Sequence, residues 1–314
     1  MSTVVRAATK QETNLRQLEL AITRRLDGLL HGEHQAFAAG SGSEAGEGRA
    51  YQPGDDARWI DWSLTARSNE VHIRNTIAGR ELETWLIIDT TASLDFGTAA
   101  WEKCDLALTA GAAFGLLGAR SGNRTAATIF DGEAMRIVPP RGGRDAVLDL
   151  LRRVERRARR DGTPTGAAIA PAPAPTLATA IRRTCATTRR RGRIVVISDL
   201  IDSSPWPDEL RAAAVRHDVV VAEVSDPRDW SLPAVGLLTL VDPETGRRRE
   251  VQTADARVRN RFAAAAVAEQ ARITAAVRSS GARHLRLSTD RDWMLDLVRF
   301  ADKRARGAKN RNAS

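Results

Sequence analysis

The chain has 314 residues, a formal net charge of +9 and an apolar content of 42%, as expected for a globular protein that buries a substantial core. Cys104 and Cys185 are its only cysteines and form no Cys-x-x-Cys pair, so the sequence indicates neither a disulfide framework nor a thiolate zinc site. No apolar run approaches the roughly 20 residues of a membrane span, and residues 1–11 lack a signal-peptide core. We therefore expect a soluble cytoplasmic protein.

The N-terminal part of the chain is predicted to precede the main domain. Residues 1–14 are polar, and we expect them to be disordered. In residues 15–30, leucine and isoleucine recur at helical spacing, which predicts an amphipathic helix ending near Gly32. The small, acidic residues 41–48 are typical of a flexible connector.

Residues 48–67 combine a Pro-Gly turn with two tryptophans, arginines and aspartates. One interpretation is a fixed loop in which the tryptophans pack and Asp61 pairs with Arg58 or Arg67. The other is a docking surface, because Trp and Arg are common interface anchors. The residues of this tentative surface are Trp59, Asp61, Trp62 and Arg67.

The central stretch of the sequence is Thr84-Trp-Leu-Ile-Ile-Asp-Thr-Thr-Ala-Ser93, preceded by a predicted strand at 71–77. Its continuous apolar run predicts a strand buried on both faces of a parallel sheet, where binding groups gather at the carboxyl ends of strands. Asp89, Thr91 and Ser93 could present oxygens to Mg²⁺ or Mn²⁺. Alternatively, Asp89 caps the next helix or accepts hydrogen bonds from loop amides.

Strands and helices alternate after this loop, which predicts a doubly wound sheet. A proline-broken segment at 161–175 precedes a helix with Thr176 as its N-cap, and the next buried strand also ends in a carboxylate, Asp199. A tail at 303–314 is basic and expected to be flexible. The predicted strands are 125–130, 135–138, 193–198, 218–224, 237–241, 248–253 and 284–287, and the predicted helices are 101–120, 144–159, 177–190, 207–216, 254–280 and 293–301.

Five motifs occur in order along the chain: Leu26-Asp-Gly-Leu-Leu-His-Gly32, Arg49-Ala-Tyr-Gln-Pro-Gly-Asp-Asp-Ala-Arg-Trp-Ile-Asp-Trp-Ser-Leu-Thr-Ala-Arg67, Arg80-Glu-Leu-Glu83, Ile197-Ser-Asp-Leu200 and Asp242-Pro-Glu-Thr-Gly246. Together they resemble the bacterial family catalogued as domain of unknown function 58, over roughly residues 15–300. The resemblance implies a von Willebrand factor A-like domain at 81–302, with a Rossmann-like sheet covered by helices on both faces, behind an N-terminal region at 15–80.

Such domains often carry a metal-ion-dependent adhesion site, built from an Asp-x-Ser-x-Ser loop, a second-loop threonine and a third-loop aspartate. Thr91 replaces the middle serine here and keeps the hydroxyl. We favour Thr176 as the second-loop residue, because prolines 171, 173 and 175 would break a helix begun earlier; Thr163 and Thr165 are the alternatives. The implied ligands of the divalent cation are Asp89, Thr91, Ser93, Thr176 and Asp199.

The resemblance also implies a partner, because members of this family are commonly encoded beside AAA+ ATPases of the MoxR type. The chain has no Walker A motif of its own, so ATP chemistry would come from that partner. We therefore expect a non-catalytic adaptor that links such an ATPase to an unknown protein client. In an adhesion site, an Asp or Glu of the bound protein completes the coordination of the cation.

Two other functions are weighed against the adaptor. A Mg²⁺-dependent phosphatase of the haloacid dehalogenase type would need a second Asp where this chain has Thr91, and a lysine in the stretch between Lys103 and Lys303, which has none. A nucleic-acid-binding role could use the arginine runs at 152–160 and 189–193. Such runs more commonly form solvated surfaces, so we expect no nucleic-acid partner.

Overall fold

The computed structural model describes residues 49–52, 60, 62–68, 70–73, 83–99, 101–120, 122–158, 174–243 and 246–300. The predicted disordered segment 1–14, the predicted helix 15–30 and the basic tail 303–314 lie outside these residues. So do four residues named above as site or partner candidates: Trp59, Asp61, Thr163 and Thr165.

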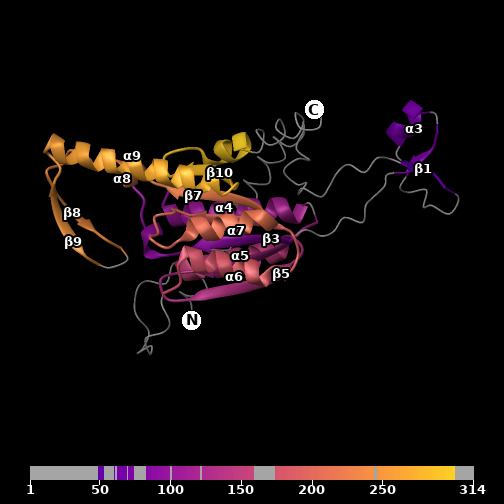
Figure 1. Cartoon of the computed structure of the whole chain (residues 1–314), viewed down its shortest axis with the longest axis horizontal. Helices are drawn as coiled ribbons and strands as arrows, with labels where there is room; N and C mark the ends of the chain where they lie inside the picture. The colour runs from indigo at the N-terminus through magenta and orange to yellow at the C-terminus, as the bar shows by residue number, and fades with distance from the viewer. Residues whose placement is uncertain are drawn as a thin grey trace, which may run out of the picture.

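A six-stranded, mainly parallel sheet forms the centre of the fold (Figure 1). Its strand order is β10-β7-β6-β3-β4-β5, and only the β4–β5 pair is antiparallel. The central strands are continuous apolar runs because both of their faces are covered. The strands are β3 Glu83–Asp89, β4 Arg124–Phe130, β5 Met135–Arg141, β6 Arg193–Ser198, β7 Asp218–Ser225 and β10 Arg283–Ser288.

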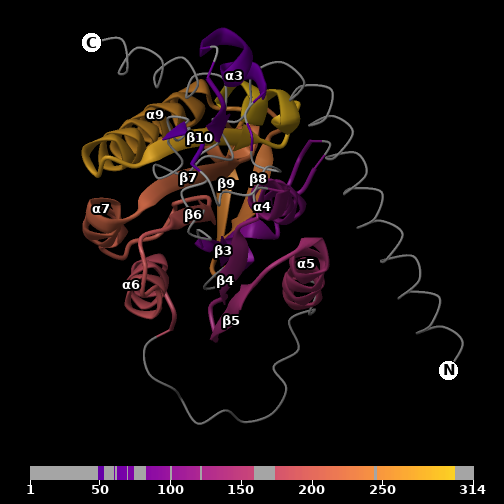
Figure 2. The same ribbon diagram turned by 90° about the vertical axis from the view of Figure 1, so that its right-hand side faces the viewer.

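Helices cover both faces of this sheet, which confirms the predicted α/β fold class (Figure 2). One face packs against α4, α5 and a helical segment at 293–300, and the other packs against α6, α7 and α9. A short helix, α8 Pro227–Trp230, follows β7 and was not predicted. The longer helices are α4 Lys103–Arg120, α5 Arg144–Ala158, α6 Leu177–Thr187, α7 Trp206–Arg216 and α9 Ala256–Ser279.

The order in which strands are added to the sheet reverses between the parallel neighbours β3 and β6. From β3 the chain adds β4 and β5 on one side, and it then returns to add β6, β7 and β10 on the other side. Parallel sheets of this kind bind ligands where the order reverses, outside the carboxyl ends of the strands. Asp89 ends β3 and Asp199 directly follows β6, so both carboxylates lie at this point.

Glycines let α4 lie close to the sheet and to α5. A Cβ at Gly118 would be 3.2 Å from Thr84 Oγ1 on β3, and a Cβ at Gly115 would be 2.8 Å from a Val147 methyl on α5. Because α4 follows the loop after β3, its N-terminus and Lys103 lie at the carboxyl edge of the sheet. The helix predicted at 101–120 begins two residues later than expected, at Lys103, and ends as predicted at Arg120.

Two further β-pairs stand outside the main sheet. The predicted hairpin forms from β8 Leu237–Val241 and β9 Arg248–Gln252. In the N-terminal region, β1 Arg49–Ala50 pairs with β2 His72–Ile73, and α3 Trp62–Ser68 lies between them in sequence. The predicted strand 71–77 is thus seen only at 72–73, since residues 74–80 lie outside the described chain. Among the described helices, none is long and apolar enough to cross a membrane.

Candidate functional site

Asp89 is a buried carboxylate whose hydrogen-bond donors are all uncharged. Its Oδ1 accepts hydrogen bonds from the backbone N–H of Thr91 at 2.9 Å and from the Thr91 hydroxyl at 2.7 Å, and its Oδ2 accepts from Ser198 Oγ at 2.7 Å. Burial, followed by the nearby charge of Asp199, raises the pKa of Asp89 to about 7. The hydrogen bonds pull the pKa down but do not offset burial.

Hydroxyl groups surround this carboxylate on two sides. The Thr91 and Ser93 hydroxyl oxygens are 3.1 Å apart in the turn after β3, and Ser198 approaches from β6. Ser198 Oγ also accepts a hydrogen bond from the backbone N–H of Leu200, a buried residue with a positive φ of 61°. A leucine rarely adopts this conformation, so the surrounding contacts must hold the turn after β6 in place.

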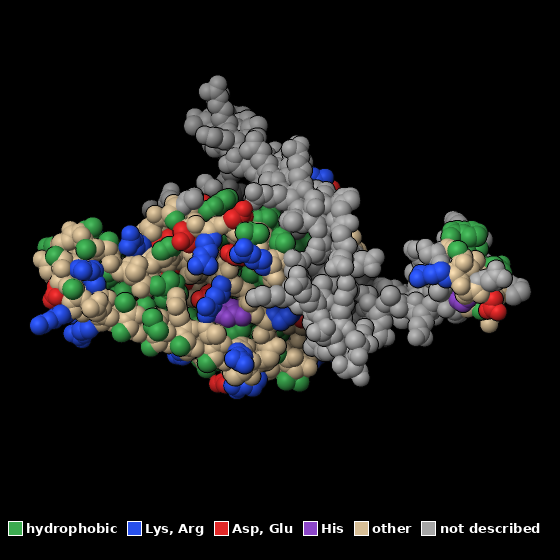
Figure 3. All heavy atoms as spheres, turned by 90° about the horizontal axis from the view of Figure 1, so that it is seen from above, with side chains coloured by type: hydrophobic (Ala, Val, Ile, Leu, Met, Phe, Trp, Pro, Cys, Tyr) green, Lys and Arg blue, Asp and Glu red, His purple; other side chains and the backbone are tan. Residues whose placement is uncertain are grey.

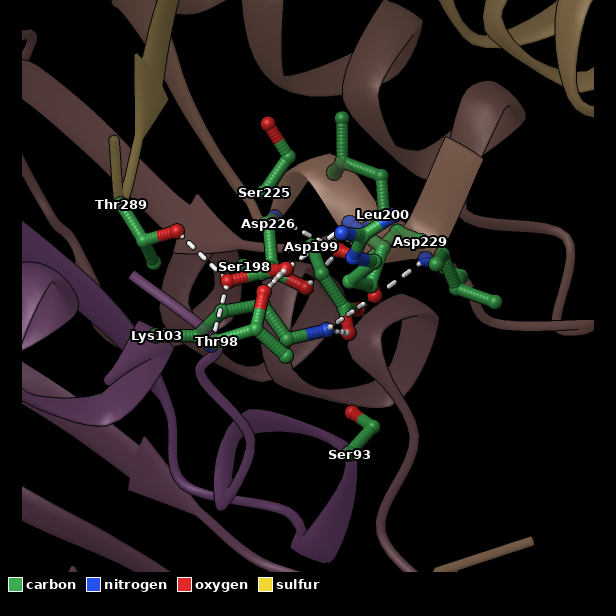
Figure 4. A network of polar contacts seen from close by, with 12 residues as sticks. Ser93, Thr98, Lys103, Ser198, Asp199, Leu200, Ser225, Asp226, Asp229 and Thr289 are labelled. Carbon is green, nitrogen blue, oxygen red and sulfur yellow. Dashed lines mark hydrogen bonds and ion pairs between the residues drawn. The ribbon is translucent and has the colours of Figure 1, made fainter. Parts of the chain in front are cut away.

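Asp199 forms an ion pair with the buried side chain of Lys103. Lys103 Nζ from α4 is 3.0 Å from Asp199 Oδ2 and 3.4 Å from Asp229 Oδ1 (Figure 4). The other oxygen of Asp199 accepts a hydrogen bond from the backbone N–H of Ile201 at 3.1 Å. Asp199 therefore lies beside Asp89, but its charge is balanced by Lys103.

A third carboxylate, Asp226, joins three loops at the same edge. Its oxygens accept hydrogen bonds from the Thr98 N–H and hydroxyl, the Thr289 hydroxyl and the Arg228 N–H (Figure 4). Burial raises the pKa of Asp226, but these hydrogen bonds outweigh burial and hold the pKa below its usual value. Asp226 thus ties the loop after β3 to the ends of β7 and β10.

Thr176 occupies the predicted N-cap of α6. Its hydroxyl and the Thr179 hydroxyl form a reciprocal capping box. Asp202, in the loop after β6, accepts a hydrogen bond from the Leu177 N–H at 2.8 Å, which fixes the start of α6 beside that loop. Thr176 is therefore at the same sheet edge as Asp89 and Asp199, with its hydroxyl used in the cap.

The donor set suits a hard divalent cation. Asp89, Thr91 and Ser93 offer only oxygen atoms, as Mg²⁺ and Mn²⁺ prefer, and Asp89 is a buried carboxylate whose pKa is raised by burial and by the charge of Asp199. Among the described residues, no group of three or more His, Cys, Asp or Glu side chains could hold a metal by itself. Further oxygens would have to come from hydroxyls, water or a partner.

Several residues of this edge were not predicted from the sequence. Asp226 follows a predicted buried strand, as Asp89 and Asp199 do, so the same strand-end pattern could have identified it. Ser198 lies within a quoted family motif, but no role was assigned to it. Lys103 and Thr98 had no signal, because their partners are distant in sequence.

The tentative partner surface is described only in part. Trp62 begins α3 and is 70% exposed, and Arg67 is exposed at the end of the same helix. Trp59 and Asp61 lie outside the described residues, so the predicted pairing of Asp61 with an arginine stays a prediction.

Solved structures with a similar arrangement include BatB from Bacteroides thetaiotaomicron, which is 14% identical with a TM-score of 0.44. An aerotolerance-related membrane protein from Bacteroides fragilis is 12% identical with a TM-score of 0.45. Each comparison covers 72% of this chain and 99% of the other chain. Likeness at this level carries no inference about function.

The sequence relatives are closer. The uncharacterized proteins Rv1480 of Mycobacterium tuberculosis and Mb1516 of Mycobacterium bovis are each 48% identical over 297 residues, covering 94% of this chain and 90% of theirs. The uncharacterized protein MAV169 of Mycobacterium avium is 44% identical over 171 residues, or 54% of this chain and 95% of that protein. The family model described as protein of unknown function DUF58 matches residues 47–272, and the chain therefore belongs to the DUF58 family.

Proposed function

We propose that the protein is a non-catalytic adaptor that binds a protein partner through a divalent cation at the carboxyl edge of a von Willebrand factor A-like domain. In this proposal, Mg²⁺ or Mn²⁺ is held by Asp89, Thr91 and Ser93 of the first loop, together with Thr176 of the second loop and Asp199 of the third. An Asp or Glu carboxylate of the partner completes the coordination.

The environment of Asp89 is the observation that carries the proposal. This carboxylate is buried at the reversal point of the sheet, its pKa is raised to about 7, and its donors are hydroxyl and amide groups. Within the described chain, the one lysine pairs with Asp199 and Asp229 instead. A buried charge of this kind is costly unless it binds a proton or a cation.

Exposed apolar side chains beside the site favour a protein over a small ion as the final ligand. Phe96, in the loop after β3, is 40% exposed, and Ile201, in the loop after β6, is 48% exposed. The Phe96 ring lies 5.9 Å from Lys103 Nζ, and the Ile201 N–H binds Asp199, so both residues flank the carboxylates. They would give a docked protein an apolar contact next to its acidic residue.

The resemblance stated above suggests the class of partner, a MoxR-type AAA+ ATPase, in protein assembly or maturation. The proposal assigns ATP hydrolysis to that ATPase and recognition to this chain.

Calorimetry with Mg²⁺ and Mn²⁺ on the wild type and on Asp89→Ala tests the site. We expect cation binding in the wild type alone, with circular dichroism showing that both proteins are folded. The second step is association with the purified MoxR-type ATPase of the source organism in Mg²⁺ or in EDTA. Equal association in both conditions, or with Asp89→Ala, would contradict the metal-dependent mechanism.

The same preparation tests the two alternatives. Lys103 does reach the site from α4, as a phosphatase would require, but Thr91 stands where a general acid is needed and its hydroxyl donates to Asp89. Asp89-dependent hydrolysis of a phosphate ester would favour that enzyme.

A nucleic-acid-binding role would need a concentrated basic surface, but the basic side chains on the face shown in Figure 3 lie among acidic and apolar ones. Binding of RNA or DNA that weakens steeply with salt would favour that role.

A further inference from the structure

Lys103 is an unusual residue for this chain. All but four of the 48 cationic side chains are arginine, and Lys103 is the only lysine between Lys10 and Lys303. It is also among the most deeply buried side chains of the described residues, at 2% exposed. One of only four lysines in an arginine-rich protein, buried at the candidate site, calls for a chemical reason.

The contacts of Lys103 indicate that reason. Its ammonium group lies between two carboxylates, 3.0 Å from Asp199 and 3.4 Å from Asp229 (Figure 4). It also lies 5.9 Å from the centroid of the Phe96 ring. An ammonium is a compact point charge with three donors, whereas a guanidinium is a wide planar fork. Lys103 thus supplies, from within the chain, the positive charge that these two carboxylates need.

The charges divide the edge of the sheet into two halves. On one side, Lys103 balances Asp199, and Asp229 also lies within its reach. On the other side, Asp89 faces only the hydroxyls of Thr91 and Ser198 and a backbone N–H. The carboxylates are close enough that the charge of Asp199 helps to raise the pKa of Asp89. Lys103 therefore neutralises part of the negative charge at this edge of the sheet, but not that of Asp89.

We propose that Lys103 is the residue that sets the cation affinity of this site: as a built-in cation it closes the Asp199 and Asp229 half, so a divalent cation is held weakly by Asp89 until a partner carboxylate arrives. This inference rests on the proposed function and deepens it. It assigns to Lys103 a positioning role, because the residue acts through Asp199 and does not itself bind the divalent cation.

Removal of the ammonium should open the closed half. In Lys103→Met, Asp199 loses its counter-charge and becomes available to a cation beside Asp89, whose pKa already reflects the nearby charge of Asp199. Affinity for divalent cations rises with the number of carboxylates in the site. We therefore expect this variant to bind a metal without help from a partner.

Calorimetry with MnCl₂ on the purified full chain, without partner, tests the inference. We expect Lys103→Met to bind Mn²⁺ at least about tenfold more tightly than the wild type. Asp229→Asn is the matched control, because it loosens the same ion cluster but keeps Lys103, and it should bind no more tightly than the wild type. Adding Asp89→Ala to Lys103→Met should abolish the gain. A gain that survives this change would overturn the inference, since the metal would then bind elsewhere.

Lys103→Met leaves buried carboxylates unbalanced, so its folding is part of the test. Should it be unfolded in EDTA, refolding is followed by circular dichroism with and without MnCl₂. Recovery that depends on Mn²⁺ supports the inference, because the metal then replaces the lost ammonium. Failure to recover in MnCl₂ overturns it.

The outcomes separate this inference from the proposed function. Asp89-dependent Mn²⁺ binding that is equal in the wild type and a folded Lys103→Met leaves the adaptor proposal standing and overturns the role of Lys103. Absence of Mn²⁺ binding in both proteins overturns both proposals. Tight binding in Lys103→Met with weak binding in the wild type supports both.

Discussion

Asp89 changes its protonation state near neutral pH, because burial and the charge of Asp199 raise its pKa from 3.8 to about 7. The folded protein therefore holds this proton more tightly than the unfolded chain does. The resulting stabilisation is complete below about pH 4 and is lost as the pH rises through about 7. Each pKa unit corresponds to about 1.4 kcal/mol, so the full effect is roughly 4 kcal/mol.

We expect the free energy of unfolding of the metal-free protein to fall by roughly 3 kcal/mol between about pH 5 and about pH 8 through this residue. Urea denaturation in EDTA at several pH values measures it. Asp89→Asn cannot titrate, so its stability should change less with pH over the same range. Identical pH dependence in the two proteins would show that Asp89 does not carry this effect.

At the level of single residues, the sequence was informative where a pattern is local. Asp89, Thr91 and Ser93 follow a recognisable buried strand, and Asp199 follows another, so their approach to one edge was predictable. The pairing of Lys103 with Asp199 was not, since it depends on how α4 packs on the sheet, which it approaches closely at Gly118. The positive φ of Leu200 also had no signal, because leucine does not favour it.

At the level of elements, the N-terminus of α6 has two roles to separate. Thr176 caps the helix together with Thr179, and it is also the proposed second-loop ligand. Thr176→Ala and Thr179→Ala should each lower the free energy of unfolding by about 1 kcal/mol, because each breaks the capping box. Only Thr176→Ala should also weaken Mn²⁺ binding. Equal Mn²⁺ affinity in the two variants would limit Thr176 to capping and return attention to Thr163 and Thr165.

The pairing of β3 with β6, which brings Asp89 to Ser198, depends on a glycine. A Cβ at Gly192, just before β6, would lie 2.4 Å from the Glu83 carbonyl oxygen. This oxygen belongs to the backbone of β3, which is paired with β6 and cannot easily move away. We expect Gly192→Ala to lower the free energy of unfolding by about 3 kcal/mol. Gly142→Ala is the control, since nothing lies within 4 Å of its Cβ. Equal melting temperatures for the two variants would contradict the predicted clash.

Most elements were predictable because their hydrophobic periods are clear. The β8–β9 hairpin and the cap of α6 fall where turn and capping residues predicted them. The strand order could not be read from periodicity, because each strand carries an apolar run that would pair equally well with several others. β5 extends past its predicted end through Pro139 and Pro140, which an edge strand tolerates.

At the level of the whole molecule, partner binding and stability should be separable. Trp62 is 70% exposed, so its side chain contributes little to the folded state of the described chain. We expect Trp62→Ala to keep the free energy of unfolding within about 0.5 kcal/mol of the wild type. It should nevertheless weaken association with the MoxR-type ATPase, measured by surface plasmon resonance, if α3 belongs to the docking surface. Unchanged affinity would remove Trp62 from that surface.

The residues that contact one another at the carboxyl edge of the sheet are far apart in sequence, so they are synthesised at different times. Ser198, which binds Asp89, emerges 109 residues after it, and Thr289 follows Asp226 by 63 residues. A nascent chain that has reached only β4 has Asp89 but none of the later oxygens. The contacts of this edge are thus complete only after β10 has been made. If the adaptor proposal holds, a chain that stops before β10 would lack these contacts and would not engage the ATPase.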